Sequence, residues 1–349
     1  MLAREIVPYA AAFARLVDRA RADVVHFNTA RGTIMAGPGA FLARRPSALH
    51  VRGTPRFDHK LWLASQALSH RVVLVARALM ADLAPSVRPR ARVVYNGVSF
   101  RAPVDRAVAR ARLEERGVRV LDGETVFASL SSLVPFKGLH HLAHAARALE
   151  DRGVRARYLV CGTGNGTPYE GWLRALVARL GLADRFVFLG FVADVHEVLS
   201  ASDALVLPSV EREELDMDGV RLAVDGNEGL PRSVLEAMGA HVGAVASDVA
   251  GVREQIEDGA SGLVVPPGDV RALADARERY AKDPALRART GARAAEIGRE
   301  RFDLDAAARG LVGALEEASR VRVFASTAAD ALRLVADGLR GAGGAERAA

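Results

Sequence analysis

Residues 227–238 read Asn-Glu-Gly-Leu-Pro-Arg-Ser-Val-Leu-Glu-Ala-Met, a glycine–leucine–proline turn that leads into a helix-forming run. The free N–H groups at the start of such a helix, together with the helix dipole, favour an anion or a hydroxyl oxygen. Glu228 precedes the turn, and Glu236 follows about two helical turns further along the chain. Two carboxylates at this spacing can bind two separate diols, although unrelated glutamates on a loop and on a helix face give the same pattern.

The sequence on both sides of this stretch alternates short β-rich runs with longer helical patterns. This alternation is typical of βαβ units and parallel sheets. Strands are expected at residues 23–28, 48–53, 71–75, 92–96, 126–133, 157–162, 186–191, 204–208, 243–247 and 262–265. We therefore predict an α/β fold with two Rossmann-like domains, in which ligands lie beyond the carboxyl ends of the strands.

The same alternation sets the expected domain boundaries. Residues 1–105 form an N-terminal domain, in which one helix, at residues 2–20, precedes the first strand. Residues 106–122 are polar and charged, and we expect them to connect this domain to a complete C-terminal domain at residues 123–300. C-terminal helices and a tail follow at residues 301–349.

Composition and charge narrow the class of protein. The 349 residues carry a net charge of +6, with +10 on residues 1–105 and −4 on the remainder. A basic half indicates an anionic partner such as nucleic acid or lipid headgroups, although the general richness in arginine offers a simpler explanation. One cysteine excludes a disulfide framework, and no apolar run approaches the ~20 residues that span a bilayer. We expect a cytoplasmic protein that lacks a secretory signal, with peripheral membrane contact left open.

Further motifs follow other expected strands. In residues 129–138, Ser-Leu-Ser-Ser-Leu-Val-Pro-Phe-Lys-Gly, a strand end and a turn place Lys137 and the N–H of Gly138 where a diphosphate can bind. A solvated surface lysine gives the same pattern. Gly162 and Gly164 follow a strand as well, and glycine lets the backbone approach a ligand, although tight turns also require it.

Taken in order, these motifs resemble the large family of retaining GT-B-fold glycosyltransferases that includes sucrose and mannosyl transferases. The resemblance covers about residues 20–300. It rests on the Asn-Gly turn at 95–98, the loop at 133–138, the segments at 188–191, 201–204 and 207–209, the paired glutamates at 228–236, and the strand–turn–strand at 247–266.

The resemblance implies a reaction and a role for each site residue. It implies transfer of a sugar from a nucleoside-diphosphate sugar to a hydroxyl acceptor, with retention and with neither a metal nor a further cofactor. The acceptor would be a growing glycan, a lipid-linked intermediate or a small molecule. By the resemblance, Glu228 contacts the transferred sugar, Lys137 the diphosphate and Glu236 the ribose. The remaining donor-binding positions are Ser132, Gly138, Gly162, Gly164, Gly229, Leu230, Pro231 and Arg232.

This sequence departs from the family pattern in its N-terminal domain. Full members of the family begin with a strand and a glycine-rich loop before the counterpart of residues 23–26, whereas here one helix precedes that strand, so the resemblance implies a short N-terminal domain. Three explanations of the short domain stay open: a start further upstream, a reduced domain, or a second chain that covers the exposed sheet edge.

The sequence also departs from the family pattern at two site positions. Ser132 stands where the family usually has an arginine, and Arg232 or Arg253 is a candidate replacement. Arg52 occupies the position of a family histidine when the sequences are aligned on Gly53, so we assign Arg52 to the catalytic site. His50, two residues earlier on the same strand face, remains the alternative.

Two other patterns are given less weight. Asp216-Met217-Asp218 resembles a metal-binding motif of another glycosyltransferase fold, but it lies in the acidic stretch at 211–218, which we expect to be a solvated loop. His140 and His144 are one helical turn apart, and we expect one packed and one exposed histidine rather than a metal site.

Rival functions also remain open. A nucleotide-sugar epimerase of the same fold and a degenerate sugar-nucleotide-binding protein are the two alternatives. Nucleic-acid binding would rest on charge alone and is not expected. The sequence leaves the base, the sugar, the acceptor and the oligomeric state undetermined.

Overall fold

The computed structural model describes residues 2–53, 59–102, 104–121, 123–226 and 228–323. The chain divides into two compact units. The first comprises Met1–Asn96 and Asp305–Ala349, and the second comprises Gly97–Leu304. The segment at 106–122, expected to connect two domains, contains helix α4 (Arg106–Glu115) and lies within the second unit.

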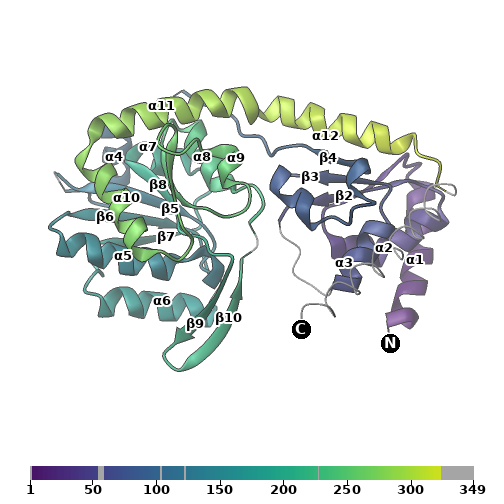
Figure 1. Ribbon diagram of the computed structural model, residues 1–349, viewed down its shortest axis with the longest axis horizontal. Coiled ribbons are helices and arrows are strands. Elements are labelled where there is room, and N and C mark those ends of the chain that lie inside the picture. Colours follow the sequence, from purple (N-terminus) through teal and green to yellow (C-terminus); the bar gives the residue numbers. More distant parts are fainter. Residues whose placement is uncertain (1, 54–58, 103, 122, 227, 324–349) are drawn as a thin grey trace, which may run out of the picture. The chain divides into compact units, whose positions relative to one another are not determined.

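The first unit contains a four-stranded parallel sheet in the order β1-β2-β3-β4 (Figure 1). Its strands are β1 (Val25–Phe27), β2 (Ser47–Val51), β3 (Arg71–Leu74) and β4 (Ala91–Val93). Its helices are α1 (Leu2–Arg19), α2 (Ala30–Leu42), α3 (His59–Ala67), the 3-10 turns η1 (Arg77–Asp82) and η2 (Arg88–Arg90), and α12 (Leu304–Ser319), which starts at the unit boundary. Among the described residues, β1 and β4 are the two edges of this sheet.

Close packing of α1 on α2 builds the core of the first unit. The hydroxyl of Thr29 caps the start of α2 by accepting a hydrogen bond from the Gly32 N–H at 3.0 Å. A Cβ atom at Gly39 would lie 2.5 Å from the carbonyl oxygen of Ala10, so the helices can approach this closely because residue 39 is glycine. Val17 and Phe27 are buried in this cluster.

The second unit contains a six-stranded parallel sheet in the order β12-β11-β8-β5-β6-β7 (Figure 1). Its strands are β5 (Thr125–Leu130), β6 (Ala156–Cys161), β7 (Phe186–Gly190), β8 (Ala204–Leu207), β11 (Ala244–Ser247) and β12 (Gly262–Val265). The chain runs outward from β5 to β7 and then resumes at β8 on the other side of β5. This reversal makes the carboxyl ends of β5 and β8 the place where a doubly wound sheet binds its ligand.

Helices cover both faces of this sheet. They are η3 (Pro135–Lys137), α5 (Leu139–Asp151), α6 (Pro168–Arg179), α7 (His196–Ala201), α8 (Arg232–Gly239), α9 (Val252–Gln255), α10 (Val270–Lys282) and α11 (Pro284–Arg301). Helices α6 and α10 contact α5, whereas α4 and α8 contact α7, and α11 contacts α8.

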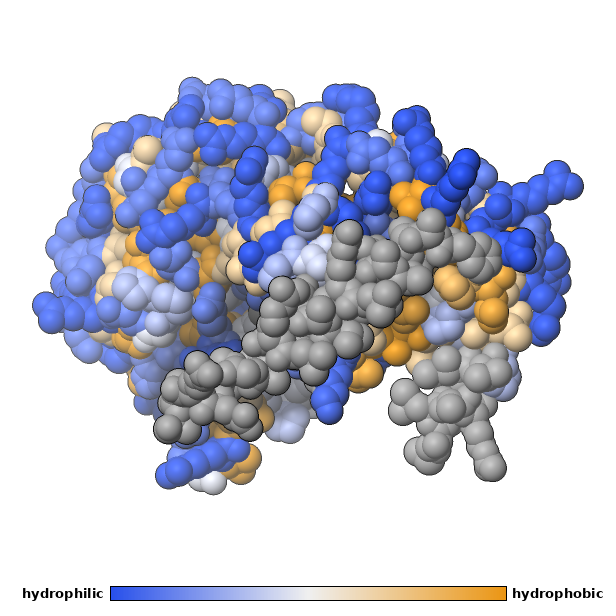
Figure 2. Space-filling model, turned by 45° about the vertical axis from the view of Figure 1, so that its right-hand side comes forward, coloured by the Kyte–Doolittle hydropathy of each residue, from blue (hydrophilic) through white to orange (hydrophobic). Residues whose placement is uncertain are grey.

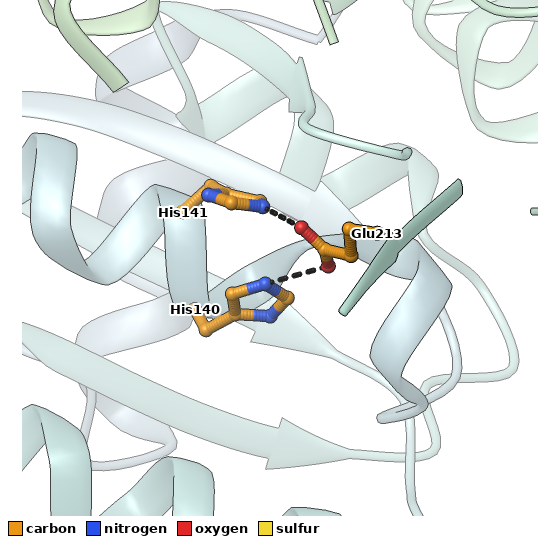
Figure 3. A group of neighbouring side chains, drawn as sticks. All are labelled: His140, His141 and Glu213. Carbon is orange, nitrogen blue, oxygen red and sulfur yellow. Dashed lines mark hydrogen bonds and ion pairs between the residues drawn. The ribbon is translucent and has the colours of Figure 1, made fainter. Parts of the chain in front are cut away.

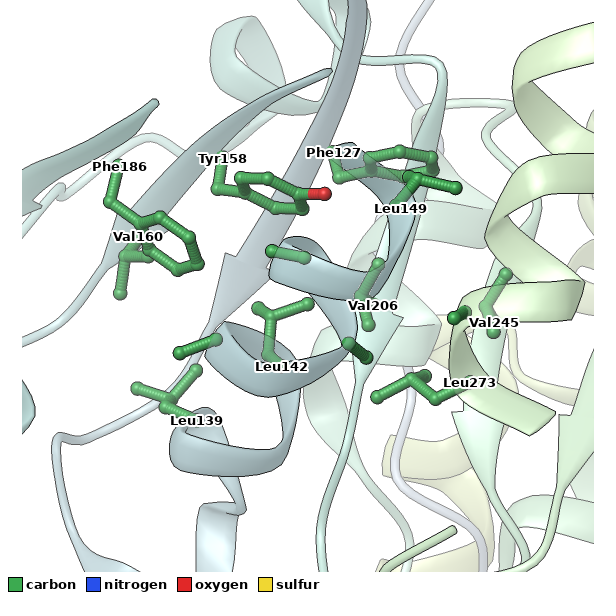
Figure 4. Packing of buried hydrophobic residues seen from close by; sticks show 14 of the residues in the cluster. Phe127, Leu139, Leu142, Leu149, Tyr158, Val160, Phe186, Val206, Val245 and Leu273 are labelled. Carbon is green, nitrogen blue, oxygen red and sulfur yellow. The ribbon is translucent and has the colours of Figure 1, made fainter. Parts of the chain in front are cut away.

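Aromatic rings from three adjacent strands form the centre of the core of the second unit (Figure 4). Tyr158 of β6 stacks on Phe127 of β5 and on Phe186 of β7, with ring centroids 5.8 and 4.6 Å apart. Leu142 and Leu149 of α5 are buried in the same cluster. Cys161 is buried as well, and this burial raises the pKa of its thiol to about 12.

All ten strands expected from the sequence are present, with ends that differ by at most a few residues. The prediction of a solvated loop at residues 211–218 is wrong, because β9 (Arg212–Met217) and β10 (Val220–Asp225) form an antiparallel hairpin there. Within the acidic stretch, Glu213, Leu215 and Met217 alternate with exposed residues, which is the period of a strand with one buried face. The helices expected after residue 269 are observed as α10, α11 and α12, and the tail beyond 323 lies outside the described residues.

A few large apolar side chains are exposed on the surface. Hydrophilic side chains predominate on the face in Figure 2, with hydrophobic ones in separate patches. Among the large hydrophobic residues that the structure describes, Phe191 is the most exposed, at 82%. No helix in the described part of the chain combines the length and apolarity that crossing a membrane requires.

Candidate active site

The loops that follow β5 and β8 meet at the carboxyl end of the six-stranded sheet. The N–H of Val210 donates a hydrogen bond to the carbonyl oxygen of Phe136 at 2.9 Å. Gly138 has a φ of 64°, and a Cβ atom there would lie 1.9 Å from the carbonyl oxygen of Pro208. Glycine at 138 therefore allows the two loops to touch, and their contact positions Lys137 at the switch point of the sheet.

Lys137 and Glu228 form an ion pair in this position. Lys137 Nζ lies 2.5 Å from Glu228 Oε1, and the hydroxyl of Ser209 donates to the same oxygen at 2.7 Å. Glu228 is only 8% exposed, and the Lys137 side chain is 19% exposed. A buried carboxylate needs such partners, because loss of its water costs several kcal/mol. The structure thus brings together the two residues that sequence analysis assigned to the sugar and the diphosphate.

A second glycine turn supports the loop that carries Glu228. Gly251 has a φ of 78°, and a Cβ atom there would lie 1.9 Å from the carbonyl oxygen of Gly229. The Gln255 side-chain amide donates to the carbonyl oxygen of Pro231 at 3.0 Å. Leu230 is buried, and α8 starts after Pro231 without a side-chain cap at that residue. The turn therefore presents an uncapped helix start beside Glu228.

Glu236 lies on α8 and borders a pocket of its own. Its Oε1 accepts a hydrogen bond from Arg232 at 3.0 Å, and the Arg232 side chain is largely exposed. Both residues line a pocket of about 240 Å³ together with Ser99, Asp194 and His196. A carboxylate and a guanidinium at the rim of one pocket offer both hydrogen-bond acceptors and donors to a polar ligand.

The predicted residues Ser132, Gly162 and Gly164 line a second pocket of about 490 Å³. Gly162 has a φ of 142°, and a Cβ atom there would lie 1.9 Å from the carbonyl oxygen of Ser131, so glycine is required. The exposed ring of Phe191 forms part of the wall. Val195 lines both pockets, so the two lie next to each other.

Ser132 carries no charge, and Arg232 and Arg253 are the candidates to supply a positive charge in its place. The described residues that line the pocket of Ser132 include no lysine or arginine. Arg232 pairs with Glu236, and Arg253 pairs with Asp248 at 2.7 Å. Lys137 is therefore the cation that lies nearest in sequence to this loop, and both arginines already have acidic partners.

The two basic candidates of the first unit occupy different environments. His50 lies on β2 and is 9% exposed, whereas Arg52 follows the strand and is exposed. The rings of His50 and His26 lie 5.3 Å apart. Burial, and then the charges of His26 and Arg52, lower the pKa of His50 to about 4, so this imidazole is neutral at pH 7. Because Arg52 and Glu228 belong to different units, a joint role for them stays a prediction.

Two contacts near this site are not apparent from the sequence pattern. Ser209 stands in a segment that carried the resemblance, but its bond to Glu228 depends on the tertiary fold. Glu213 contacts His140 and His141, and its place within an acidic run concealed it. His140 is packed and His144 is exposed, as expected for that helix. Asn227 lies outside the described residues.

The two-unit α/β architecture is the GT-B fold, and solved structures of glycosyltransferases share it. A structure of Anabaena HepE in complex with UDP and glucose has a TM-score of 0.74 at 23% identity, over 87% of this chain and 80% of that chain. Sucrose-phosphate synthase from Thermosynechococcus elongatus has a TM-score of 0.72 at 21% identity, over 88% and 77%.

The chain belongs to the group 1 glycosyl transferases, whose family model matches residues 112–297. It is 30% identical over 289 residues to the α-D-kanosaminyltransferase of Streptomyces kanamyceticus, which is 79% of this chain and 68% of that protein. It is also 33% identical over 169 residues to the colanic acid biosynthesis glycosyltransferase WcaL of Escherichia coli, but it spans only 38% of that protein.

Proposed function

We propose that this protein transfers a hexose-type sugar from a nucleoside-diphosphate sugar to a hydroxyl acceptor, with retention of configuration and without a catalytic metal ion. The bond between the anomeric carbon and the diphosphate breaks, a bond to the acceptor oxygen forms, and the proton of the acceptor hydroxyl passes to the leaving diphosphate. The observation that carries the proposal is the Lys137–Glu228 ion pair at the switch point of the sheet.

Lys137 and Glu228 have different roles in the proposed reaction. The leaving diphosphate gains negative charge as the bond breaks, and the Lys137 ammonium can neutralise part of it. The uncapped start of α8 adds N–H groups and the positive end of a helix dipole. The Glu228 carboxylate can accept hydrogen bonds from the hydroxyls of the transferred sugar. Ser209 would hold this carboxylate in place.

Because the two pockets are adjacent, different parts of one donor molecule can occupy each of them. We assign the ribose hydroxyls to Glu236, which lines the smaller pocket. The larger pocket, with its glycine backbone and the Phe191 ring, suits the remaining nucleotide or sugar. HepE, which shares the fold, was solved with UDP and glucose, so we propose UDP as the nucleotide to test first.

We propose that the first unit contributes the residues that bind the acceptor. We propose that Arg52 acts in the reaction and that the positive charge of residues 1–105 favours an acceptor at an anionic membrane surface. Arg52→Ala should lower kcat for transfer and leave the affinity for the nucleotide unchanged. Sedimentation with anionic and with neutral lipid vesicles tests the membrane contact, because binding that does not depend on lipid charge contradicts it.

Thermal unfolding with UDP, GDP, ADP and TDP tests the donor site directly. A nucleotide at a hundred times its Kd stabilises the native protein by about 2.7 kcal/mol. We expect a rise in Tm with UDP that Glu236→Ala abolishes and that Glu300→Ala, a change at an exposed glutamate of α11, leaves intact. A nucleotide effect that persists in Glu236→Ala would contradict the assigned ribose contact.

Product analysis tests the reaction itself. With UDP-glucose and an acceptor, the anomeric configuration of the product can be read by NMR, and inversion would contradict the proposed retention. Conversion of the donor into another sugar nucleotide without any acceptor would indicate an epimerase instead. Metal-free protein is expected to transfer the sugar, even if at a lower rate, when no metal ion takes part in the chemical step.

A further inference from the structure

Helix α5 begins directly after Lys137 and Gly138, and its first turn carries two adjacent histidines. The side chains of His140 and His141 both point toward Glu213, which comes from strand β9 of the hairpin at 212–225 (Figure 3). The three residues are far apart in the sequence and come from two separate elements. None of them belongs to the donor site described above.

The three side chains converge on one small space. His141 Nε2 lies 2.6 Å from Glu213 Oε2, and His140 Nε2 lies 2.9 Å from Glu213 Oε1. One ligand atom from each residue can be chosen so that all lie within 4.8 Å of one another. The His140 side chain is 4% exposed, and both other side chains are 17% exposed. The cluster is therefore largely shielded from water and keeps a narrow opening to solvent.

His140 and Glu213 form a close ion-pair contact whose direction is poor for a hydrogen bond. Both His140 Nε2 and Glu213 Oε1 are buried without a hydrogen-bond partner, although they lie 2.9 Å apart. The oxygen therefore lies off the direction in which a ring N–H points. Two side chains that bind one metal ion have this geometry, because the lone pair of each ligand atom points at the ion and not at the other ligand atom.

The other nitrogen of His140 is held in place. Its Nδ1 lies 2.9 Å from the hydroxyl oxygen of Tyr169. When the Nδ1–H donates to this hydroxyl, the Nε2 lone pair faces the carboxylate of Glu213. Histidines that bind metals usually have such a partner on the second ring nitrogen, which fixes the tautomer and the ring orientation.

From this arrangement we propose that His140, His141 and Glu213 form a binding site for one divalent cation of the zinc type. Two imidazoles and one carboxylate match the preference of Zn²⁺, whereas Mg²⁺ and Ca²⁺ prefer oxygen ligands. Ligands about 2.0–2.2 Å from one tetrahedral ion lie about 3.3–3.5 Å apart. Binding thus requires the Glu213 carboxylate to withdraw by roughly half an ångström, and water completes the coordination at the opening.

The bound ion fastens the hairpin at 212–225 to the start of α5. The hairpin follows Ser209 and precedes Glu228, and α5 follows Lys137. The ion therefore ties together the segments that carry these three donor-site residues. Its role is structural, and it takes no part in the sugar transfer proposed above.

Metal binding to the full chain tests this site. Protein stripped with EDTA and then dialysed should bind one equivalent of Zn²⁺ in calorimetry, and Co²⁺ should give the visible absorption of a tetrahedral site. Glu213→Gln and His141→Ala should each weaken Zn²⁺ binding at least about 100-fold, since loss of a ligand exceeds the usual 10–100-fold effect of an outer partner. Tyr169→Phe should weaken it by about 10–100-fold.

Two matched variants serve as controls. Glu214→Gln changes an exposed carboxylate of the same hairpin, and His144→Ala changes an exposed histidine of the same helix. Both should bind Zn²⁺ like the unchanged chain. Absence of saturable Zn²⁺ binding, or equal affinity in Glu213→Gln and Glu214→Gln, would overturn the site. The nucleotide-induced rise in Tm is measured on metal-free protein, so failure here is distinguishable from failure of the donor site.

Discussion

Lys137 Nζ lies 2.5 Å from Glu228 Oε1, although 91 positions separate the two residues in the sequence. The contact forms because strands β5 and β8 are neighbours in the sheet and the loops after them touch. Each charge compensates the other in a largely buried position. In the proposed reaction, a bound diphosphate would offer Lys137 a second anion and leave the carboxylate available to sugar hydroxyls.

Removal of the Lys137 charge should impair the reaction more than it impairs nucleotide binding. For Lys137→Met we expect kcat to fall about 100- to 1000-fold, the usual loss for one group that stabilises a developing anion. Steady-state measurement of UDP release with an acceptor checks this. Lys282→Met provides the control, because Lys282 is an exposed lysine on α10 whose loss should leave kcat unchanged. A loss of similar size in both variants would contradict the assigned role.

Glycine at 138 should be essential to the shape of the loop. Gly138→Ala places a Cβ atom against the carbonyl of Pro208, so the two loops must separate. Gly153→Ala is the matched control, since Gly153 also has a positive φ, 78°, but has nothing within 4 Å of the added atom. Gly153→Ala should lower the free energy of unfolding by about 1–2 kcal/mol, the cost of a left-handed residue. Gly138→Ala should cost more in urea unfolding, and an equal cost would show that the loops do not touch.

The buried imidazole of His50 should make stability depend on pH. Its pKa is about 4 in the folded chain and about 6.5 when unfolded, so the unfolded state binds the proton more readily. The stabilising contribution of the neutral ring is complete above pH 6.5 and is lost as the pH falls toward 4, up to about 3 kcal/mol. His50→Leu should flatten the pH dependence of unfolding between pH 4 and 6.5. His59→Leu, at an exposed position, should retain it, and parallel curves for all three proteins would contradict the prediction.

The single cysteine provides a probe of local opening. Burial raises the pKa of Cys161 to about 12, so almost no thiolate exists at pH 8 in the folded chain. A thiol reagent should therefore label the native protein at least about 1000-fold more slowly than the urea-unfolded protein. Cys161→Ser should show no labelling in either state. Rapid native labelling would mean that this part of β6 opens readily although it is paired with a strand on each side.

Local patterns were sufficient to predict every strand of both sheets, because apolar runs of strand length bounded by glycine or proline signals are visible in one sequence. They were insufficient at Glu213, where a charged stretch forms a hairpin whose buried face becomes apparent only after folding. The same limit applies to Ser209. Its hydroxyl is unremarkable in sequence, and its role depends on the distance to Glu228 in the folded unit.

The β9–β10 hairpin connects two parts of the active site without belonging to the sheet. Its base is fixed, because the N–H of Gly226 donates to the carbonyl of Glu211, and a Cβ atom at Gly226 would strike the carbonyl oxygen of Val210. Its tip at Asp218 and Gly219 is exposed, and there Asp218 pairs with Arg179 of α6 at 3.1 Å. We therefore expect that a change in the length of the tip removes this one exposed ion pair and leaves Ser209 and Glu228 in their positions.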